Sequence, residues 1–483
     1  MFQSKGDVDS MLFHTWPFLI FFALVILGLS LLRRTRLWLA WLLIASYFFY
    51  GWWNPFYLVL ILYSTLLDYW VVAAMDRCRA APAHWFSGRR FWLFVSIANN
   101  LALLGFFKYA DFLIANINTL LDTTGAPFQL TSAKELMPFG WTYLLPVGIS
   151  FYTFQSLSYT IDFYRGEIGR EKSFIRFATF VSLFPQLVAG PIERSSNLLP
   201  QLVRAPQFAW ANLTDGMSLF LVGLFKKVAL ANYLAHYVET VYAQPQSFSA
   251  SALMLATFCF AWQIYFDFSG YTDMARGVAR AMGFELMLNF NNPYLATGLG
   301  DFWSRWHISL SSWFRDYVYI PLGGNRGSEW TTYRNLFLVF VISGFWHGAA
   351  WTFIVWGALH AVGTIATRAL ERSTWYRHHV PRFAKQMAVF VFVCFAWIFF
   401  RAQSMGDALT IVAGIARNSW SDPACPWLML ALVGSVWIYQ FIHESQWQAV
   451  LEWPSVKVGL AIAMCAYLCL CPSAGGEFLY FQF

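Results

Sequence analysis

The side chain with the clearest chemical potential is the imidazole of His347, which lies in the middle of a long apolar run without charged residues, 335–367. As one helix this run would span about 50 Å, against a hydrocarbon core of about 30 Å. His347 would then lie near mid-bilayer, where an imidazole is costly unless it faces a cavity or a partner. Two interpretations stay open: a functional histidine, or one that is hydrogen-bonded to a neighbouring helix. For His360, in the same run, we favour the second.

Basic residues flank the run on both sides, Arg326 and Arg334 before it and Arg368 and Arg372 after it. Because short loops rich in Lys and Arg stay on the cytoplasmic side, both ends are expected there. The run is therefore predicted to break or to double back as a hairpin. Glycine offers possible break points at Gly344, Gly348 and Gly357.

A second candidate segment, 300–324, mixes charged and aromatic residues at close to helical spacing. The pattern is typical of an amphipathic helix that lies at the membrane interface. The segment contains Trp306, His307, Ser311, Arg315 and Asp316. From the pattern alone, His307 is expected to be an interfacial polar residue without a role.

A third feature is Asp267, which closes an apolar run. It is either a solvated helix end or a buried carboxylate paired with a basic residue, and the sequence leaves both open. Lys226 and Lys227 end another apolar run, and we expect their ammonium groups to reach the cytoplasmic surface.

Composition decides what kind of protein must position these residues. Of 483 residues, 58% are hydrophobic, 20% aromatic and only 12% charged. This excludes a disordered protein, a fibrous protein and an ordinary cytosolic enzyme. It predicts an all-α polytopic membrane protein, a bundle of helices with re-entrant and interfacial elements around a central tunnel. The net charge of +7 comes mostly from short loops, so no nucleic-acid partner is inferred. The seven cysteines show no metal-ligand spacing, and no metal is expected.

The apolar runs give an expected topology. Residues 16–32 are read as a retained span, and Arg33, Arg34 and Arg36 after it place the N-terminus outside. The stretch 174–200 is apolar but interrupted by proline and glycine, which predicts a re-entrant element. We expect one domain over 1–483, with spans in 401–476 and an aromatic tail over 477–483. The other predicted spans are 37–53, 56–75, 91–107, 141–163, 214–233, 251–268, 386–400, 427–442 and 456–471.

Several long stretches resemble one family. WHISLSSWFRDYVYIPLGGNR (306–326) and SGFWHGAAWTFIVWGALH (343–360) resemble the membrane-bound O-acyltransferase family, in particular its bacterial branch with the alginate O-acetylation membrane subunit. Stretches 103–112, 146–166, 184–195 and 263–277 resemble the same branch, so the likeness covers about 11–400. The sequence from Met11 resembles the usual start of the family, which makes Met11 an alternative initiator to Met1.

The resemblance implies an O-acyltransferase with His347 as the essential histidine and His307 as a second histidine facing the same tunnel. Donor acetyl-CoA would enter from the cytoplasm, and a glycan acceptor would approach from outside. A neutral imidazole suits the attack of a hydroxyl on a thioester, and His307 would hold the carbonyl or stabilise the oxyanion. The resemblance also implies the bacterial inner membrane and a periplasmic, hydrolase-like acetyltransferase partner. Supporting residues would be Trp306, Ser311, Arg315, Asp316, Trp346 and Asp267.

The chain ends in the sequence Glu477 to Phe483, which differs from a common protease site at Phe478 and Phe483. We interpret it as native, because it resembles tails of this branch and of a small partner protein in teichoic-acid D-alanylation. By that analogy Tyr480 is an acyl relay; the alternative is an aromatic anchor at the interface.

Two further functions stay open at this stage. The same fold could transfer another acyl group, D-alanyl or longer, to a teichoic acid, lipid or protein hydroxyl. A proton-coupled transporter using His347 and Asp267 is the alternative of another class, although the internal symmetry common in transporters is not seen.

Overall fold

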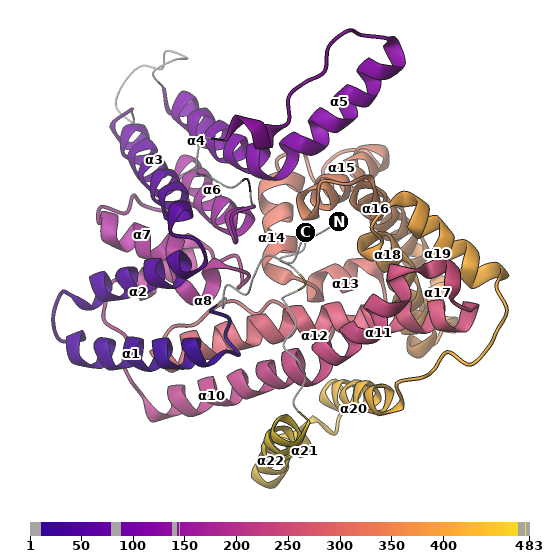
Figure 1. Cartoon of the computed structure of the whole chain (residues 1–483). Helices are drawn as coiled ribbons and strands as arrows, with labels where there is room; N and C mark the ends of the chain where they lie inside the picture. Colours follow the sequence, from indigo (N-terminus) through magenta and orange to yellow (C-terminus); the bar gives the residue numbers. More distant parts are fainter. Residues whose placement is uncertain (1–10, 79–87, 138–142, 144, 472–478, 480–483) are drawn as a thin grey trace. The chain divides into compact units, whose positions relative to one another are not determined.

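The computed structural model describes residues 11–78, 88–137, 143, 145–471 and 479, and every regular element in these ranges is a helix (Figure 1). The chain forms two compact units. Unit 1 comprises 1–217 and 275–287, and unit 2 comprises 218–274 and 288–483. The predicted all-helical class is confirmed. Within the described ranges six helical stretches are long and apolar enough to cross a membrane: Pro55–Arg77, Arg89–Thr124, Trp210–Ala243, Ala250–Met282, Trp351–Arg372 and Arg382–Arg401.

Unit 1 is built mainly from the N-terminal helices, whose bounds follow the apolar runs closely. Its helices are α1 (Trp16–Leu32), α2 (Trp38–Trp53), α3 (Leu58–Arg77), α4 (Arg89–Leu104), α5 (Ala110–Thr124), α6 (Ile149–Arg165), α7 (Phe174–Ser182), α8 (Phe184–Leu187) and α9 (Ser195–Gln201). The first apolar run is a helix over its full predicted length. The interruption of 174–200 is also confirmed, because the stretch forms three short helices, of which α7 and α8 are largely buried. A re-entrant path stays a prediction.

The run predicted over 141–163 forms a helix only from Ile149. Gly148 precedes it with φ of +76°, and a Cβ there would lie 2.4 Å from the carbonyl oxygen of Leu187. This close approach requires glycine, because a side chain would clash and the left-handed backbone disfavours other residues. Part of the predicted span, residues 141, 142 and 144, lies outside the described residues.

Helices α10 (Trp210–Leu224) and α12 (Ala250–Met282) each contribute to both units. Within unit 2, a Cβ on Gly223 would lie 2.5 Å from the carbonyl oxygen of Gly270, so the two helices touch backbone to backbone there. Small residues at a crossing allow such contact between apolar helices. Helix α12 is much longer than its apolar part, 251–268, because it continues through polar residues to Met282.

Unit 2 holds the C-terminal helices and the segments that carry the candidate chemistry. Its further helices are α11 (Asn232–Ala243), α13 (Leu299–Arg305), α14 (Ile308–Phe314), α15 (Glu329–His347), α16 (Trp351–Arg372), α17 (Thr374–His379), α18 (Arg382–Arg401), α19 (Met405–Arg417), α20 (Trp427–His443), α21 (Gln448–Leu451) and α22 (Pro454–Leu470). Two π-helical segments, η5 (Phe225–Ala231) and η8 (Arg315–Tyr319), extend α10 and α14.

The uncharged run 335–367 doubles back, as predicted. Helix α15 ends at His347, Gly348 is extended with φ of −164°, and α16 begins at Trp351. Of the three candidate glycines only Gly348 lies at the break. Gly344 and Gly357 serve another purpose: a Cβ on either would lie 2.3 Å from a carbonyl oxygen of the opposite helix. They let the two helices of the hairpin pack at short distance.

The prediction of one amphipathic helix over 300–324 is wrong. The segment forms α13 and α14, interrupted at Trp306 and His307, and then the π segment η8. The interruption arises because His307 adopts the left-handed conformation, with φ of 44° and ψ of 54°. Helical spacing of apolar residues continues across the break, which is why the pattern resembled one helix.

Replacing Gly357 by Ala tests the hairpin contact. Its Cβ would meet the carbonyl oxygen of Phe340 at 2.3 Å, and overpacking of this kind costs about 1–3 kcal/mol. We therefore expect a lower midpoint of thermal unfolding for the purified protein in detergent. The control is Gly434→Ala in α20, where a Cβ meets nothing within 4 Å. Equal midpoints for the two variants would contradict the close packing.

Candidate active site

His307 is held by Asn289, a residue that comes well before it in the chain. The side-chain Oδ1 of Asn289 lies 3.0 Å from Nδ1 of His307 and accepts hydrogen bonds from the amide (3.2 Å) and hydroxyl (2.9 Å) of Ser309. The Asn289 carbonyl accepts another from the amide of Ile308 at 2.9 Å. Histidine and asparagine side chains are both buried, with 0% and 1% exposure. These bonds hold the backbone at the left-handed turn, where a residue other than glycine is uncommon.

The hydrogen bonds also fix the tautomer of His307. Because Oδ1 of Asn289 accepts from a backbone amide, it acts as an acceptor toward the ring too, so Nδ1 of His307 carries the proton. In the neutral ring Nε2 therefore keeps its lone pair. Burial lowers the pKa of His307 to about 3, which keeps the ring neutral near pH 7. A neutral ring of this tautomer accepts a hydrogen bond at Nε2, so it does not suit the expected role of oxyanion donor.

His347 closes α15 and is packed among aromatic rings. Its side chain is 5% exposed. The ring centroid lies 5.2 Å from that of Trp356 and 5.3 Å from that of Phe400. Trp346 lies between the two histidines, with its ring 4.9 Å from His347 and 6.5 Å from His307. The structure thus brings His347, Trp346 and His307 together within unit 2.

Further aromatic side chains pack around His307 and its neighbours. The ring of Phe268 on α12 meets His307 edge-on at 4.6 Å between centroids. Trp306, 3% exposed, stacks on Phe302 at 5.5 Å. His360 is fully buried and contacts Trp303 and Trp356, but neither of its ring nitrogens has a hydrogen-bond partner in the part of the chain that the structure describes. The expectation of a hydrogen-bonded His360 therefore does not hold there.

A cavity of about 220 Å³ lies beside the same helices. Ser311 on α14, Arg315 at the start of η8 and Ser343 on α15 supply polar groups to an otherwise apolar wall. Arg315 forms an ion pair with Asp316, Nε to Oδ1 at 2.8 Å. Ser343 lies one helical turn before His347. Two of the predicted supporting residues thus line a cavity close to the hairpin, while the predicted central tunnel stays a prediction.

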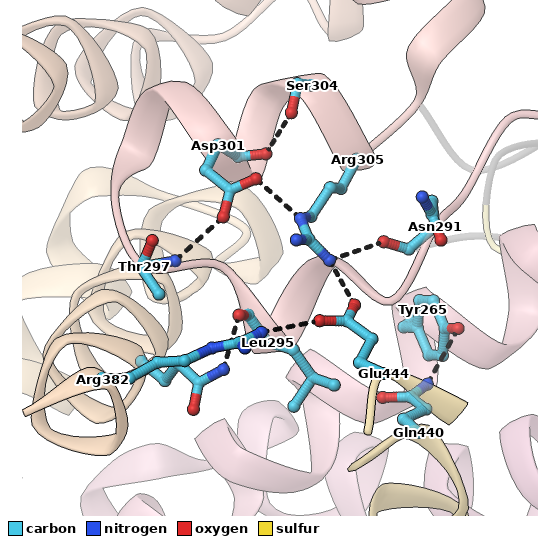
Figure 2. A network of polar contacts seen from close by, with 11 residues as sticks. Tyr265, Asn291, Leu295, Thr297, Asp301, Ser304, Arg305, Arg382, Gln440 and Glu444 are labelled. Carbon is cyan, nitrogen blue, oxygen red and sulfur yellow. Dashed lines mark hydrogen bonds and ion pairs between the residues drawn. The ribbon is translucent and has the colours of Figure 1, made fainter. Parts of the chain in front are cut away.

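A polar network around Arg305 fixes the C-terminal end of α13. Figure 2 shows Arg305 between two carboxylates: its Nε donates to Asp301 at 2.7 Å, and its Nη1 pairs with Glu444. Glu444, directly after α20, also pairs with Arg382 of α18 at 2.9 Å. Since Arg305 precedes His307 by two residues, the network holds the helix that leads into the left-handed turn.

Asp267 is a buried carboxylate paired with a lysine, which decides between the two interpretations left open by the sequence. Its Oδ1 binds Nζ of Lys227, and the two side chains are 5% and 3% exposed. Lys226 pairs with Asp273 at 2.6 Å. The expectation that the Lys227 ammonium reaches the membrane surface is therefore wrong, because it is buried against Asp267. For Lys226, which is partly exposed, it stays a prediction.

The second oxygen of Asp267 accepts a hydrogen bond from the backbone amide of Leu479 at 2.8 Å. Leu479 is 4% exposed. Its neighbour Tyr480 lies outside the described residues, as do the rest of the tail positions of 472–483. Within the described ranges no three His, Cys, Asp or Glu side chains are grouped as ligands for a metal ion.

Sequence reasoning missed Asn289, the pairing of Lys227 and the role of Glu444. Asn289 lies in a loop without regular structure, and nothing near it in the sequence signals a partner 18 residues away. A buried Asp267 paired with a basic residue was one of the two interpretations that the sequence left open, but the sequence did not identify Lys227 as the partner.

Replacing His307 by Asn should reduce the pH dependence of stability. An unfolded histidine binds a proton below about pH 6.5 and the buried one does not, so stability falls as the pH drops from about 6 to 4, by about 1.4 kcal/mol per unit. Asparagine tolerates the left-handed backbone but cannot titrate. Thermal unfolding across this pH range should therefore be flatter for the variant. His378→Asn, at an exposed histidine, should keep the wild-type slope; an equal slope for His307→Asn would refute the buried neutral ring.

Comparison with known proteins identifies the family of this chain. The model of the membrane-bound O-acyltransferase family matches residues 163–406. A probable alginate O-acetylase, AlgI, of Pseudomonas aeruginosa is 41% identical over 400 residues, which cover 82% of this chain and 73% of the relative. A peptidoglycan O-acetyltransferase of Helicobacter pylori is 37% identical over 402 residues, 78% of this chain and 73% of the relative.

A teichoic acid D-alanyltransferase of Bacillus subtilis is 29% identical over 272 residues, 53% of this chain and 68% of the relative. The resemblance that the motifs suggested is therefore confirmed over most of the chain. With its all-helical fold, its apolar helices and these relatives, the chain belongs to the membrane-bound O-acyltransferase family and is a membrane O-acyltransferase.

Proposed function

We propose that this enzyme moves acetyl groups from cytoplasmic acetyl-CoA across the bacterial inner membrane for O-acetylation of an exported polysaccharide or cell-wall glycan. The observation that carries the proposal is the buried pair His307 and His347, joined through Trp346, in a chain about 40% identical to alginate O-acetylases. Relatives named for alginate and for peptidoglycan support a glycan acceptor.

His347 is the proposed general base. A hydroxyl attacks a thioester only when its proton is taken up, and a neutral imidazole can take it near pH 7. The ring of His347 is packed against Trp356 and Phe400. His307, whose Nε2 has a lone pair, would accept a hydrogen bond from the same hydroxyl and orient it. Asn289 then serves as a positioning residue.

The cavity lined by Ser311, Arg315 and Ser343 is the proposed place of approach for the donor. Apolar walls suit the acyl chain, and a guanidinium at the same cavity suits a phosphate of coenzyme A. Trp306, Asp316 and Trp346 would support this region, Asp316 by holding the Arg315 guanidinium. No metal enters the proposed reaction.

Tyr480 is the proposed acyl relay. In the first step the carbon–sulfur bond of the thioester breaks, a bond to the phenol oxygen forms, and the phenol proton passes through the histidine to the departing thiolate. In the second step a glycan hydroxyl attacks the aryl ester, the bond from the carbonyl carbon to the phenol oxygen breaks, and the proton of the hydroxyl passes to the phenolate. Because a phenol with a pKa near 10 is a better leaving group than a sugar hydroxyl, this second step runs toward the glycan.

A periplasmic, hydrolase-like acetyltransferase is the proposed partner that completes the transfer, and the N-terminus is placed outside on the basis of Arg33, Arg34 and Arg36. The similarity to a teichoic acid D-alanyltransferase supports a second candidate, the same fold carrying D-alanyl. The transporter interpretation is set aside, because the chain belongs to an acyltransferase family.

His347→Ala should abolish transfer. We expect at least about a hundredfold loss of labelled acetyl from acetyl-CoA onto protein and glycan in membranes that contain the enzyme, since a general base contributes about 10²–10⁴-fold. The control is His378→Ala, in the exposed helix α17, which should keep wild-type transfer. Transfer by His347→Ala at the wild-type rate would refute the assignment. Labelled D-alanine on the glycan in place of acetyl would favour the second candidate.

Tyr480→Phe should stop acetylation of the exported acceptor, because it removes the phenol oxygen and leaves the ring. Mass spectrometry of the purified wild-type enzyme after incubation with acetyl-CoA should find acetyl on Tyr480, and the variant should carry none there. Retained acetylation of the acceptor by Tyr480→Phe would exclude the relay and leave an aromatic anchor.

A further inference from the structure

The carboxylate of Asp267 uses both of its oxygens, and each has a different kind of partner. Oδ1 binds the ammonium of Lys227, and Oδ2 accepts the backbone N–H of Leu479 at 2.8 Å. The carboxylate lies on α12 in the interior of unit 2, and the residue it holds is more than two hundred positions away in the sequence. We propose that Asp267, with its charge balanced by Lys227, is the anchor that binds the C-terminal tail at Leu479 and thereby positions the tail for acyl transfer. This inference rests on the relay role proposed for Tyr480.

Lys227 makes a buried carboxylate possible at this place. An isolated charge in an apolar interior is strongly unfavourable, whereas a charge that is paired and hydrogen-bonded is tolerated. The lysine reaches α12 because Gly270 brings the backbones together: a Cβ on Gly270 would lie 3.1 Å from Cβ of Lys226 and from the amide of Lys227. The π segment η5 carries both lysines, and such segments are frequent at functional sites.

The anchor holds Leu479 through two interactions. A hydrogen bond to a charged group is stronger than one between neutral groups. The Leu479 side chain is 4% exposed, so its burial adds a hydrophobic contribution. Both oppose the conformational entropy that is lost when this residue is fixed.

The anchor is adjacent to the histidine site. Phe268 follows Asp267 directly, and its ring lies 4.6 Å from the ring of His307. One turn of α12 thus supplies both the carboxylate that binds the tail and an aromatic wall of the His307 site.

The test uses the backbone amide itself. Leu479→Pro removes the N–H that Asp267 accepts, while Leu479→Ala keeps it and loses part of the side chain. We expect kcat for transfer to the glycan to fall at least about tenfold more in Leu479→Pro than in Leu479→Ala, since about 1.4 kcal/mol corresponds to a factor of ten. The KM for acetyl-CoA should stay within about twofold in both, because the tail does not bind the donor; a structural defect would change both constants.

A second readout does not depend on acyl transfer. Carboxypeptidase digestion of the purified full-length protein, followed by intact mass, should stop before Leu479 in the wild type and continue past it in Leu479→Pro and Asp267→Asn. Because Asp267→Asn leaves a buried lysine, the double variant Asp267→Asn/Lys227→Met accompanies it and should show the same loss of protection.

Each outcome decides the inference. Equal protection of the wild type and Leu479→Pro would overturn the anchor. Lost protection with unchanged transfer would overturn the positioning role. If Tyr480→Phe keeps full transfer, the relay fails but the protection pattern still shows whether the anchor exists, so the two failures are distinguishable.

Discussion

Oδ1 of Asn289 meets three donors in one buried place: Nδ1 of His307, and the amide and hydroxyl of Ser309. The geometry of the candidate site depends on this cluster. It holds a histidine in the left-handed conformation, turns the chain between α13 and α14, and leaves Nε2 of the ring as an acceptor. Without it the segment 300–324 would be free to continue as the single amphipathic helix that its apolar spacing favours, and the imidazole would point elsewhere.

A site of this kind needs helices that approach closely, because the groups that it brings together lie on short side chains. Glycines supply the approach in two places. Gly344 and Gly357 are contact points between α15 and α16, the two helices of the hairpin that turns after His347. Gly223 and Gly270 are contact points between the helical stretches that carry Lys227 and Asp267. Lipid gives apolar helices little reason to prefer one another over acyl chains, so backbone contact at small residues decides which faces meet.

The helical class and the approximate bounds of most predicted spans followed from the sequence, since long apolar runs bounded by arginine have few alternatives in a bilayer. The hairpin was predictable for the same reason: 335–367 is too long for one span. The turn at His307 was not, because it depends on Asn289, whose position relative to the histidine only the folded chain determines. The sequence did not identify Lys227 as the partner of Asp267, because a lysine at the end of an apolar run can also reach solvent. Only the folded chain shows the crossing at Gly270 that brings this lysine to α12.

The Asp267 carboxylate also connects Leu479, a residue far along the sequence, to the helix that packs on His307. Transfer between two groups demands their placement to within about an ångström, and flexible loops rarely provide it. Helix α12 carries the acceptor of the Leu479 amide and the ring that packs on His307 in consecutive residues. A rigid helix therefore sets the separation of tail and imidazole, and the ion pair with Lys227 lets the negative charge that binds the tail persist in an apolar interior.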